Sequence, residues 1–569
     1  MTPRSLSARI AQGRGAATAD LVLKNVRLFD LVTGALVPTD IAICGDTIVG
    51  TYGEYRGARE IDGAGRVAVP GFIDTHLHIE TSMITPLEFD RCVLPHGVTT
   101  IFCDPHEIAN VLGAEGIRYF LDCAEHTIMD VRVNLSSCVP AASFEQAAAR
   151  LEIGDLLPFR AHPKAYGLAE MMNYPGVLAC DPGVLATLEA FQSGHIDGHA
   201  PLLRGLPLNG YLAAGIRTDH ETTNAAEARE KLSKGMAILI REGSASKDLD
   251  ALAEVLDADS SAFIALCTDD RSPLDIAEEG HIDAMIRRLI AKGSPPHHVY
   301  RSAALSAARI FGLRDRGMIA PGWRADIVLL DDLERCAVSD VVAGGRLVTK
   351  ALFDARPDVP HVGLGSMKRG PVTAADFICR PKPGANTTPV IGVKAGLLIT
   401  SRESATLAVT ESGLAADVDK DVLKVAVLER HGKTGDIGVG FVTGFGLQRG
   451  AIASSMGHDS HNICVVGVDD QDMAVAVNRV IAMGGGFAVA EGGAVVAEMA
   501  LRLAGLMSLE PFETVTHQLE HMLAAARRLG CSLPEPLIQV AFLALPVIPH
   551  LKMTPRGLFD VDRFQFEDS

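Results

Sequence analysis

The chain has 569 residues, of which 48% are hydrophobic and 21% charged, so we expect a globular protein with more than one domain. Its formal net charge of −18 repels phosphate backbones and argues against nucleic-acid polymers as partners. Eleven cysteines stand at irregular spacing without a CxxC pair, and no apolar run reaches membrane-spanning length, so we expect a cytoplasmic protein without a disulfide framework or a membrane anchor.

Short strand patterns separated by turns fill residues 20–69. The dipeptides Gly45-Asp46 and Asp62-Gly63 supply turn chemistry, and no helical period is present. We therefore predict that residues 1–71 form the N-terminal part of a small β domain, with residues 1–19 as a flexible extension.

From Phe72 onward, short apolar runs alternate with helical stretches. The predicted strands are GFIDTH, GVTTIFCD, VRVNLSSCV, KAYGLAE, HIDGHA, GIRTDH, MAILIRE and FIALCTD. The predicted helices include residues 108–125, 184–192, 225–234 and 274–291. Eight strand–helix units in about 240 residues have the rhythm of a (β/α)8 barrel, which we place at residues 72–318.

Strand patterns return after the barrel, in PGWRADIVLLDD and SDVVAGGRLVT. We expect residues 319–367 to complete the N-terminal β domain, the Pro/Gly-rich residues 368–389 to form a linker, and residues 390–569 to form a separate α/β domain. The predicted fold class is thus α/β: a TIM-type barrel, a small split β domain and an additional C-terminal α/β domain.

Catalytic groups of such barrels lie where strands end, so the residues after each strand were compared. Strand 1 ends in His76-Leu-His78, and residues two apart on a strand share a face, so both imidazoles can bind one metal. A lone HxH is often a pair of surface histidines, but this pair follows an apolar strand. After strand 2, Glu107 has two equally favoured roles, a cap for the next helix and a bridging metal ligand.

Acids and histidines also follow strands 4, 5, 6 and 8. Glu170 has apolar neighbours, so we expect burial to raise its pKa and make it a candidate acid. His199 and His220 follow strands 5 and 6, Asp269 follows strand 8, and His195 at the start of strand 5 is expected to be structural. Mixed imidazole and carboxylate ligands suit Zn, Fe(II) or Mn, and a bound metal activates water, so the site predicts hydrolysis but no particular substrate.

The motif series PGFIDTHLH, HAP, TDHE and TDD resembles the amidohydrolase superfamily. Within it, the chain is similar to the bacterial-type adenine deaminases, through HLHIETSM, CDPHEIANV, GLAEMMNYPGV, GHIDGHAP, CTDDRSP and SMGHDSHNI. The resemblance covers nearly the whole chain, including the final domain. It implies hydrolytic deamination of adenine to hypoxanthine and ammonia by a metal-bound hydroxide, in purine salvage.

The resemblance also implies two divalent metals, with Mn²⁺ expected and Fe²⁺ or Zn²⁺ as alternatives. The implied ligands are His76, His78 and Asp269 for one metal and His199 and His220 for the other, with Glu107 as the bridge. Many relatives use a lysine after strand 4, where this chain has Glu170, so the bridge stays open between Glu107 and Glu170.

The implied catalytic residues are Glu170, Asp269 and His220. Glu170 would protonate a ring nitrogen, Asp269 would carry a proton from the hydroxide to the departing ammonia, and His220 would also steer the hydroxide.

Two further sets are predicted on weaker grounds. Glu80 and Ser82 are expected to line the purine pocket. A C-terminal loop carrying His458, Asp459 and His461 is expected to close the barrel mouth as a lid, although a plain turn between two strands would also fit.

Two rival hypotheses stay open on the sequence alone: another amidohydrolase acting on a cyclic amide or an N-acetyl sugar, and a non-catalytic barrel that serves as a scaffold. The expected partners are the small molecule adenine and a second copy of the chain in a homo-oligomer, most simply a dimer.

Overall fold

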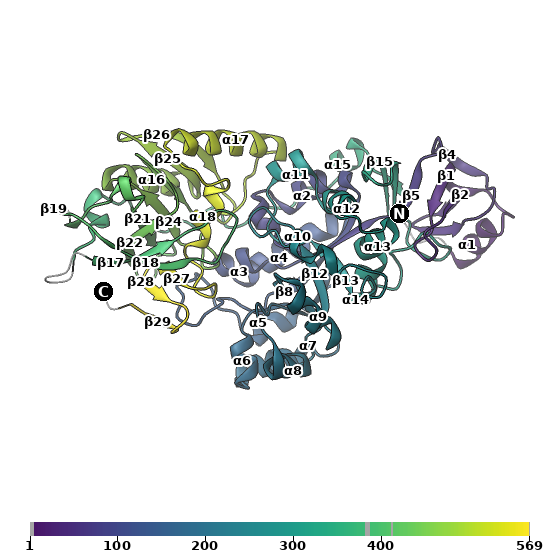
Figure 1. Cartoon of the computed structure of the whole chain (residues 1–569). Helices are drawn as coiled ribbons and strands as arrows, with labels where there is room; N and C mark the ends of the chain where they lie inside the picture. The colour runs from purple at the N-terminus through teal and green to yellow at the C-terminus, as the bar shows by residue number, and fades with distance from the viewer. Residues whose placement is uncertain (1–4, 382–386, 411–412, 568–569) are drawn as a thin grey trace.

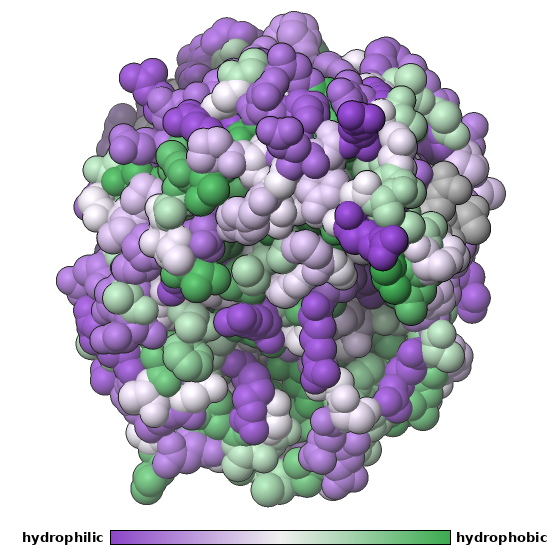
Figure 2. Space-filling view, turned by 90° about the vertical axis from the view of Figure 1, so that its right-hand side faces the viewer, coloured by the Kyte–Doolittle hydropathy of each residue, from purple (hydrophilic) through white to green (hydrophobic). Residues whose placement is uncertain are grey.

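The computed structural model describes residues 5–381, 387–410 and 413–567. A small β sheet lies at one end, a barrel in the middle and a second large sheet at the other end (Figure 1). Viewed from the small β sheet's end, hydrophilic side chains predominate and hydrophobic ones are interspersed among them (Figure 2). No helix in the described ranges is long and apolar enough to cross a membrane.

The small β sheet combines two segments that flank the barrel in sequence. Its strands are β1 (Ala19–Phe29), β2 (Leu36–Cys44), β3 (Thr47–Gly50), β4 (Gly57–Asp62), β5 (Val67–Pro70), β14 (Ile327–Asp332), β15 (Ala337–Ala343) and β16 (Arg346–Leu347). The join is antiparallel pairing of β5 with β14, where Val69 lies opposite Val328. The chain thus leaves this sheet, builds the barrel and returns.

The N-terminal segment differs from the flexible extension that the sequence predicted. Leu6–Gly13 form helix α1, capped by the Ser5 hydroxyl, which accepts a hydrogen bond from the Ala8 N–H at 3.2 Å. The buried Gln12 amide then bonds to Asp20 through both its nitrogen and its oxygen. The cap and this side-chain anchor hold the segment on the sheet.

Eight parallel strands form the barrel, one at each of the eight predicted positions. They are β6 (Phe72–Leu77), β7 (Val98–Cys103), β8 (Asp130–Leu135), β9 (Ala165–Met171), β10 (Ile196–Gly198), β11 (Thr218–Asp219), β12 (Ala237–Arg241) and β13 (Ile264–Cys267). The first and last strands meet at Leu77 and Asp269, where the Asp269 N–H donates to the His76 carbonyl at 3.0 Å. Strand exits 1 and 8 are therefore neighbours.

Helices surround the barrel. The main ones are α2 (Pro86–Val93), α3 (His106–Leu112), α4 (Ala114–His126), α7 (Pro182–Phe191), α8 (Gly205–Ala213), α9 (Ala225–Ser233), α11 (Pro273–Glu279) and α12 (Ile282–Ala291). Where the sequence predicted one helix over residues 108–125, Gly113 with φ 62° separates α3 from α4. Gly280 separates α11 from α12 in the same way.

The C-terminal sheet has eight strands with helices on both faces. The strands are β17 (Thr387–Gly392), β18 (Ser401–Thr406), β21 (Leu423–Leu428), β22 (Ile437–Thr443), β23 (Ala451–Ser454), β24 (Ile463–Gly467), β25 (Gly486–Glu491) and β26 (Ala494–Ala500). The helices are α16 (Asp470–Met483), α17 (Phe512–Arg528) and α18 (Pro536–Phe542). A hairpin, β27 (Leu551–Thr554) and β28 (Gly557–Asp560), follows with β29 (Gln565–Phe566).

The C-terminal sheet packs directly on the barrel. One continuous apolar core includes Val98 of β7 as well as Val425 of β21. At the interface the Ser508 N–H donates to the Met83 carbonyl at 2.7 Å, and Arg91 of α2 forms an ion pair with Glu513 of α17. The two parts are therefore joined by apolar packing, a backbone bridge and an ion pair.

Candidate metal centre

The end of strand β6 presents the two histidines of the HxH motif to the barrel interior. The Nδ1 atom of His76 lies 2.9 Å from Asp197 Oδ2, and His78 Nδ1 donates to the Asp104 carbonyl at 3.0 Å. These bonds leave both Nε2 atoms facing the site. His76 Nε2 is buried and has no hydrogen-bond partner in the part of the chain that the structure describes, as expected of a nitrogen that binds a metal.

Glu170 at the end of strand β9 lies between the histidines of strand exits 1, 5 and 6. Its Oε1 is 3.3 Å from His78 Nε2, and its Oε2 is 3.3 Å from His220 Nε2 and 2.6 Å from His199 Nδ1. The sequence predicted a raised pKa here, and that was wrong. Burial alone raises the pKa of Glu170, but the charge of His199 and hydrogen bonds from three imidazoles hold it well below its usual range.

Asp269 closes the same cluster from strand exit 8. Its Oδ1 lies 3.3 Å from His78 Nε2, and its Oδ2 accepts a hydrogen bond from Arg241 Nη1 at 2.9 Å. Although burial raises the pKa of Asp269, the bond to His78 and the positive charge of Arg241 lower it well below its usual range. The carboxylate is thus held as an anion with one oxygen turned to the cluster.

His220 stacks on His76, with ring centroids 3.8 Å apart and an interplanar angle of 13°. Its Nδ1 is buried, and none of the described residues forms a hydrogen bond with it. His195, expected to be structural, lies away from the cluster against Phe311, with ring centroids 4.1 Å apart.

Glu107 lies apart from the His199 and His220 pair. Its Oε1 is 2.6 Å from His458 Nδ1, and its Oε2 contacts His461 Nε2. Both histidines belong to the loop between β23 and β24, so this barrel carboxylate holds the predicted lid loop in place. Burial raises the pKa of Glu107, but the charges of His458, His461 and His106 keep it well below its usual range.

The loop is a turn between β23 and β24, and its two histidines contact Glu107 of the barrel. The side chain of Arg430 is fully buried and donates hydrogen bonds to the His461 and Ala504 carbonyls, which holds the loop in position. The loop also brings Asp459 to 3.8 Å from His106 Nε2. The C-terminal segment thus contributes side chains next to the candidate metal centre.

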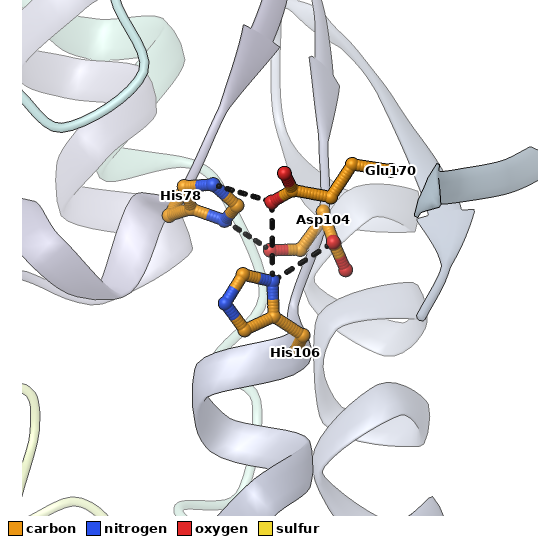
Figure 3. Close-up of side chains that lie close together, drawn as sticks. All are labelled: His78, Asp104, His106 and Glu170. Atoms are coloured by element: carbon orange, nitrogen blue, oxygen red, sulfur yellow. Dashed lines mark hydrogen bonds and ion pairs between the residues drawn. The ribbon is translucent and has the colours of Figure 1, made fainter. Parts of the chain in front are cut away.

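His106 was not among the predicted site residues, yet it lies between Glu170 and Glu107. Its Nδ1 lies 2.9 Å from Asp104 Oδ2 and 3.7 Å from Glu170 Oε1 (Figure 3). Its Nε2 lies 3.4 Å from Glu107 Oε1. The signal for it was present in CDPHE, where His106 shares a strand exit with residues that the sequence analysis did weigh.

Arg241 and Asp197 were not predicted either. Strand exit 7, which carries Arg241, was given no role, and in HIDGHA only the two histidines were considered. Arg241 binds Asp269 and Glu221, and Asp197 orients His76. Partners of this kind are visible only once distant strands are brought together.

Glu80 and Ser82, the two residues predicted to line a purine pocket, differ in their hydrogen bonding. Glu80 is fully buried, and its Oε1 accepts a hydrogen bond from the Ile108 N–H at 3.0 Å, while its Oε2 has no hydrogen-bond partner within residues 5–381, 387–410 and 413–567. Burial raises the pKa of Glu80 to about 8. Ser82 donates its hydroxyl proton to the Ile79 carbonyl at 2.5 Å, within its own turn.

The side chains at the barrel mouth form several sets that can hold a metal ion, with ligand atoms mutually within 4.8 Å. Three of these sets are His76, Glu170 and His220; His76, His78 and Asp269; and His78, Asp104, His106 and Glu170. Imidazole nitrogens and carboxylate oxygens suit borderline divalent metals, and among the described residues His76 Nε2 and His220 Nδ1 find no hydrogen-bond partner. The residues present therefore fit a divalent metal centre.

Barrel, split β sheet and strand-exit ligands together define a metal-dependent amidohydrolase, and residues 67–348 match the amidohydrolase family model. Residues 397–565 match the adenine deaminase C-terminal domain. An adenine deaminase of Methylobacterium nodulans is 63% identical over 99% of both chains. Adenine deaminase 1 of Agrobacterium fabrum is 60% identical over 98% of this chain and 97% of its own. The chain belongs to the adenine deaminase family.

Among solved structures, an N-acetyl-D-glucosamine-6-phosphate deacetylase from Mycobacterium smegmatis aligns over 58% of this chain and 100% of its own, with a TM-score of 0.45 and 16% identity. An adenosine deaminase from Xanthomonas campestris with bound zinc aligns over 59% of this chain and 97% of its own, with a TM-score of 0.45 and 15% identity.

Proposed function

We propose that the protein hydrolyses adenine to hypoxanthine and ammonia, as a step of purine salvage. The observation that carries the proposal is the placement of Glu170 between the histidines of strand exits 1, 5 and 6. Over nearly its full length, the sequence that carries this site is similar to proteins named adenine deaminases.

The proposed ligands follow from the cluster. His76, His78 and Asp269 would hold one metal and His199 and His220 the other. Glu170, rather than Glu107, would bridge them, because Glu170 contacts both groups of histidines and Glu107 is engaged by the lid loop. Divalent metals, Mn²⁺ first and Fe²⁺ or Zn²⁺ as alternatives, would lower the pKa of a bound water and supply a nucleophile at neutral pH.

Proton transfer is assigned to Asp269. Its Oδ1 is free of Arg241, so it can accept the proton of the water that attacks C6 of adenine. As the new C–O bond forms and the C6–N bond breaks, this proton passes to the amino group, which leaves as ammonia, and the second proton of the water ends on the ring nitrogen beside C6 of hypoxanthine. His220, stacked on His76 and bonded to Glu170, would orient the attacking water.

Two further features belong to the proposal. The protein would work in the cytoplasm, because its eleven cysteines stand at irregular spacing without a CxxC pair, which suits a reducing compartment. We also expect a homodimer, to be checked by light scattering coupled to size-exclusion chromatography.

The deciding experiment incubates protein reconstituted with Mn²⁺ with adenine and follows hypoxanthine and ammonia, with adenosine and cytosine in parallel. Turnover of adenine that Asp269→Asn abolishes would support the substrate and the site together. Protein that binds metal but leaves adenine unchanged would overturn the substrate. Cyclic amides and N-acetyl sugars would then be assayed, while protein that purifies without metal would favour the scaffold hypothesis.

A further inference from the structure

The histidines of the candidate metal centre are oriented in two different ways. The two at strand exit 1 each have a hydrogen-bond partner that fixes the ring and lies outside the set of ligands. Among the described residues, the rings of His199 and His220 form hydrogen bonds and ion pairs only with carboxylates that can bind the metal themselves. The direction of these two rings therefore depends on the backbone that carries them.

His199 and His220 stand on either side of a gap in the backbone hydrogen bonding of the barrel. Strands β6 to β10 form one sheet and β11 to β13 another, and within the described part of the chain no ladder joins β10 to β11. The other junction, between β13 and β6, has a backbone bridge. Side chains therefore hold strand exits 5 and 6 together, beginning with a hydrogen bond from the Thr218 hydroxyl to Asp197.

Lys231 of α9 makes the connection nearest to the two histidines. Its side chain is fully buried, and its ammonium donates to the Ala200 carbonyl at 2.8 Å and to Asp219 Oδ2 at 2.8 Å. Ala200 directly follows His199, and Asp219 directly precedes His220. One ammonium thus joins the chain next to both histidines.

The partners of Lys231 hold the loop after strand 5 as well. Asp219 Oδ1 accepts a hydrogen bond from the Ala200 N–H at 2.8 Å. Glu227 Oε1 accepts hydrogen bonds from Lys231 at 2.7 Å and from the Leu202 N–H at 3.0 Å. Leu202 has φ 59°, a left-handed conformation that is uncommon outside glycine, so these bonds hold the loop in a shape that its backbone disfavours.

This cluster buries two carboxylates and one ammonium, although apolar side chains of similar size often stabilise a fold as well as a buried ion pair does. We propose that Lys231 is a positioning residue for the metal that His199 and His220 would hold. The inference rests on the proposed function and deepens it, because it names what sets the distance between strand exits 5 and 6. Lys231 contacts neither of the two rings and acts through the backbone on both sides of the gap.

The first test is Lys231→Met, which keeps the length of the side chain and removes its charge and its donors. Metal-free full-length protein is titrated with Mn²⁺ and followed by electron paramagnetic resonance. We expect two sites in the wild type. The variant should keep one site at wild-type affinity and bind at the other at least tenfold more weakly, because losing a group that orients a ligand costs about 10–100-fold in metal affinity.

The matched control is Lys234→Met, three residues further along the chain. Lys234 also contacts the polypeptide after strand 5, since it donates to the Gly205 carbonyl at 2.7 Å, but its ion pair is with Glu230. Lys234→Met should bind Mn²⁺ as the wild type does at both sites.

A double variant separates positioning from the balance of buried charge. Lys231→Met leaves two buried carboxylates without their cation, whereas Lys231→Met/Glu227→Gln removes one positive and one negative charge and so restores the net charge of the cluster. We expect its melting temperature to return towards that of the wild type while the second site stays at least tenfold weaker. This variant also carries the test if Lys231→Met does not fold. Recovery of both properties would assign Lys231 to stability alone and overturn the proposal.

Two results with folded Lys231→Met would also overturn it: wild-type affinity at both sites, or equal weakening of the two. The titration contains no adenine. If metal-loaded wild-type protein leaves adenine unchanged, the proposed function fails, and the titration still decides the role of Lys231.

Discussion

Glu170 and Glu107 are both buried carboxylates surrounded by imidazoles, but they hold different parts of the molecule. Glu170 contacts His78, His199 and His220 inside the barrel, whereas Glu107 contacts His458 and His461 of the lid loop. Substituting each carboxylate in turn can therefore test which of the two bridges the metals.

Glu170→Gln should therefore lose bound metal, and activity should fall by more than the factor of about 10–100 seen when only an outer partner of a ligand is changed. Glu107→Gln, its matched control, should keep the wild-type metal content. Metal analysis of the two purified variants is the measurement. Loss of metal in Glu107→Gln with retention in Glu170→Gln would reverse the assignment.

At the scale of elements, all eight barrel strands were predicted from the sequence, because each is a short apolar run set between longer helical stretches. It was harder to predict which residues of a strand exit take part in the site and in which role. Glu170 was assigned a raised pKa because its sequence neighbours are apolar, but its spatial neighbours are imidazoles from three other strands. His106 and Arg241 were not predicted for the same reason, because contacts between distant strands leave no local pattern in the sequence.

The lid loop between β23 and β24 is expected to govern turnover more than metal binding. In the double variant His458→Ala/His461→Ala, Glu107 loses its two partners in the loop and keeps His106, and we expect the barrel mouth to open to water, so activity should drop at least tenfold while metal content stays unchanged. The control is His517→Ala/His521→Ala, an exposed histidine pair on α17. Full activity in the first variant would remove the lid from the mechanism.

Strand β27 carries Lys552, a fully buried lysine whose ammonium donates to the Leu398 and Phe542 carbonyls. Burial lowers its pKa to about 7 from an ordinary value of 10.5. Between pH 7 and 10.5 the unfolded chain binds this proton and the folded chain does not, so the free energy of unfolding should rise with pH by about 1 kcal/mol per unit.

Lys552→Met removes that dependence. Denaturant unfolding of wild type and variant at pH 7.5, 8.5 and 9.5 gives the difference in slope, and parallel pH dependences would contradict the expected pKa.

At the scale of the whole molecule, the barrel and the C-terminal sheet share one apolar core and join through Ser508, Arg91 and Glu513. We expect both parts to unfold in one cooperative transition, followed by calorimetry and far-UV circular dichroism. A fragment of residues 1–367 should be poorly soluble, because it exposes the barrel side of that core. Two resolved transitions, or a soluble folded fragment, would contradict this.

The pairing of β5 with β14 sets an order in which the chain can mature. Val69 and its partner Val328 are separated by the whole barrel in sequence, so the first strands leave the ribosome long before the strands that complete their sheet. At a synthesis rate of about 5–20 residues per second, that interval lasts roughly 13 to 52 seconds. During that interval the edge of β5 that pairs with β14 stays open, and an exposed strand edge can pair with another chain until β14 has been synthesised.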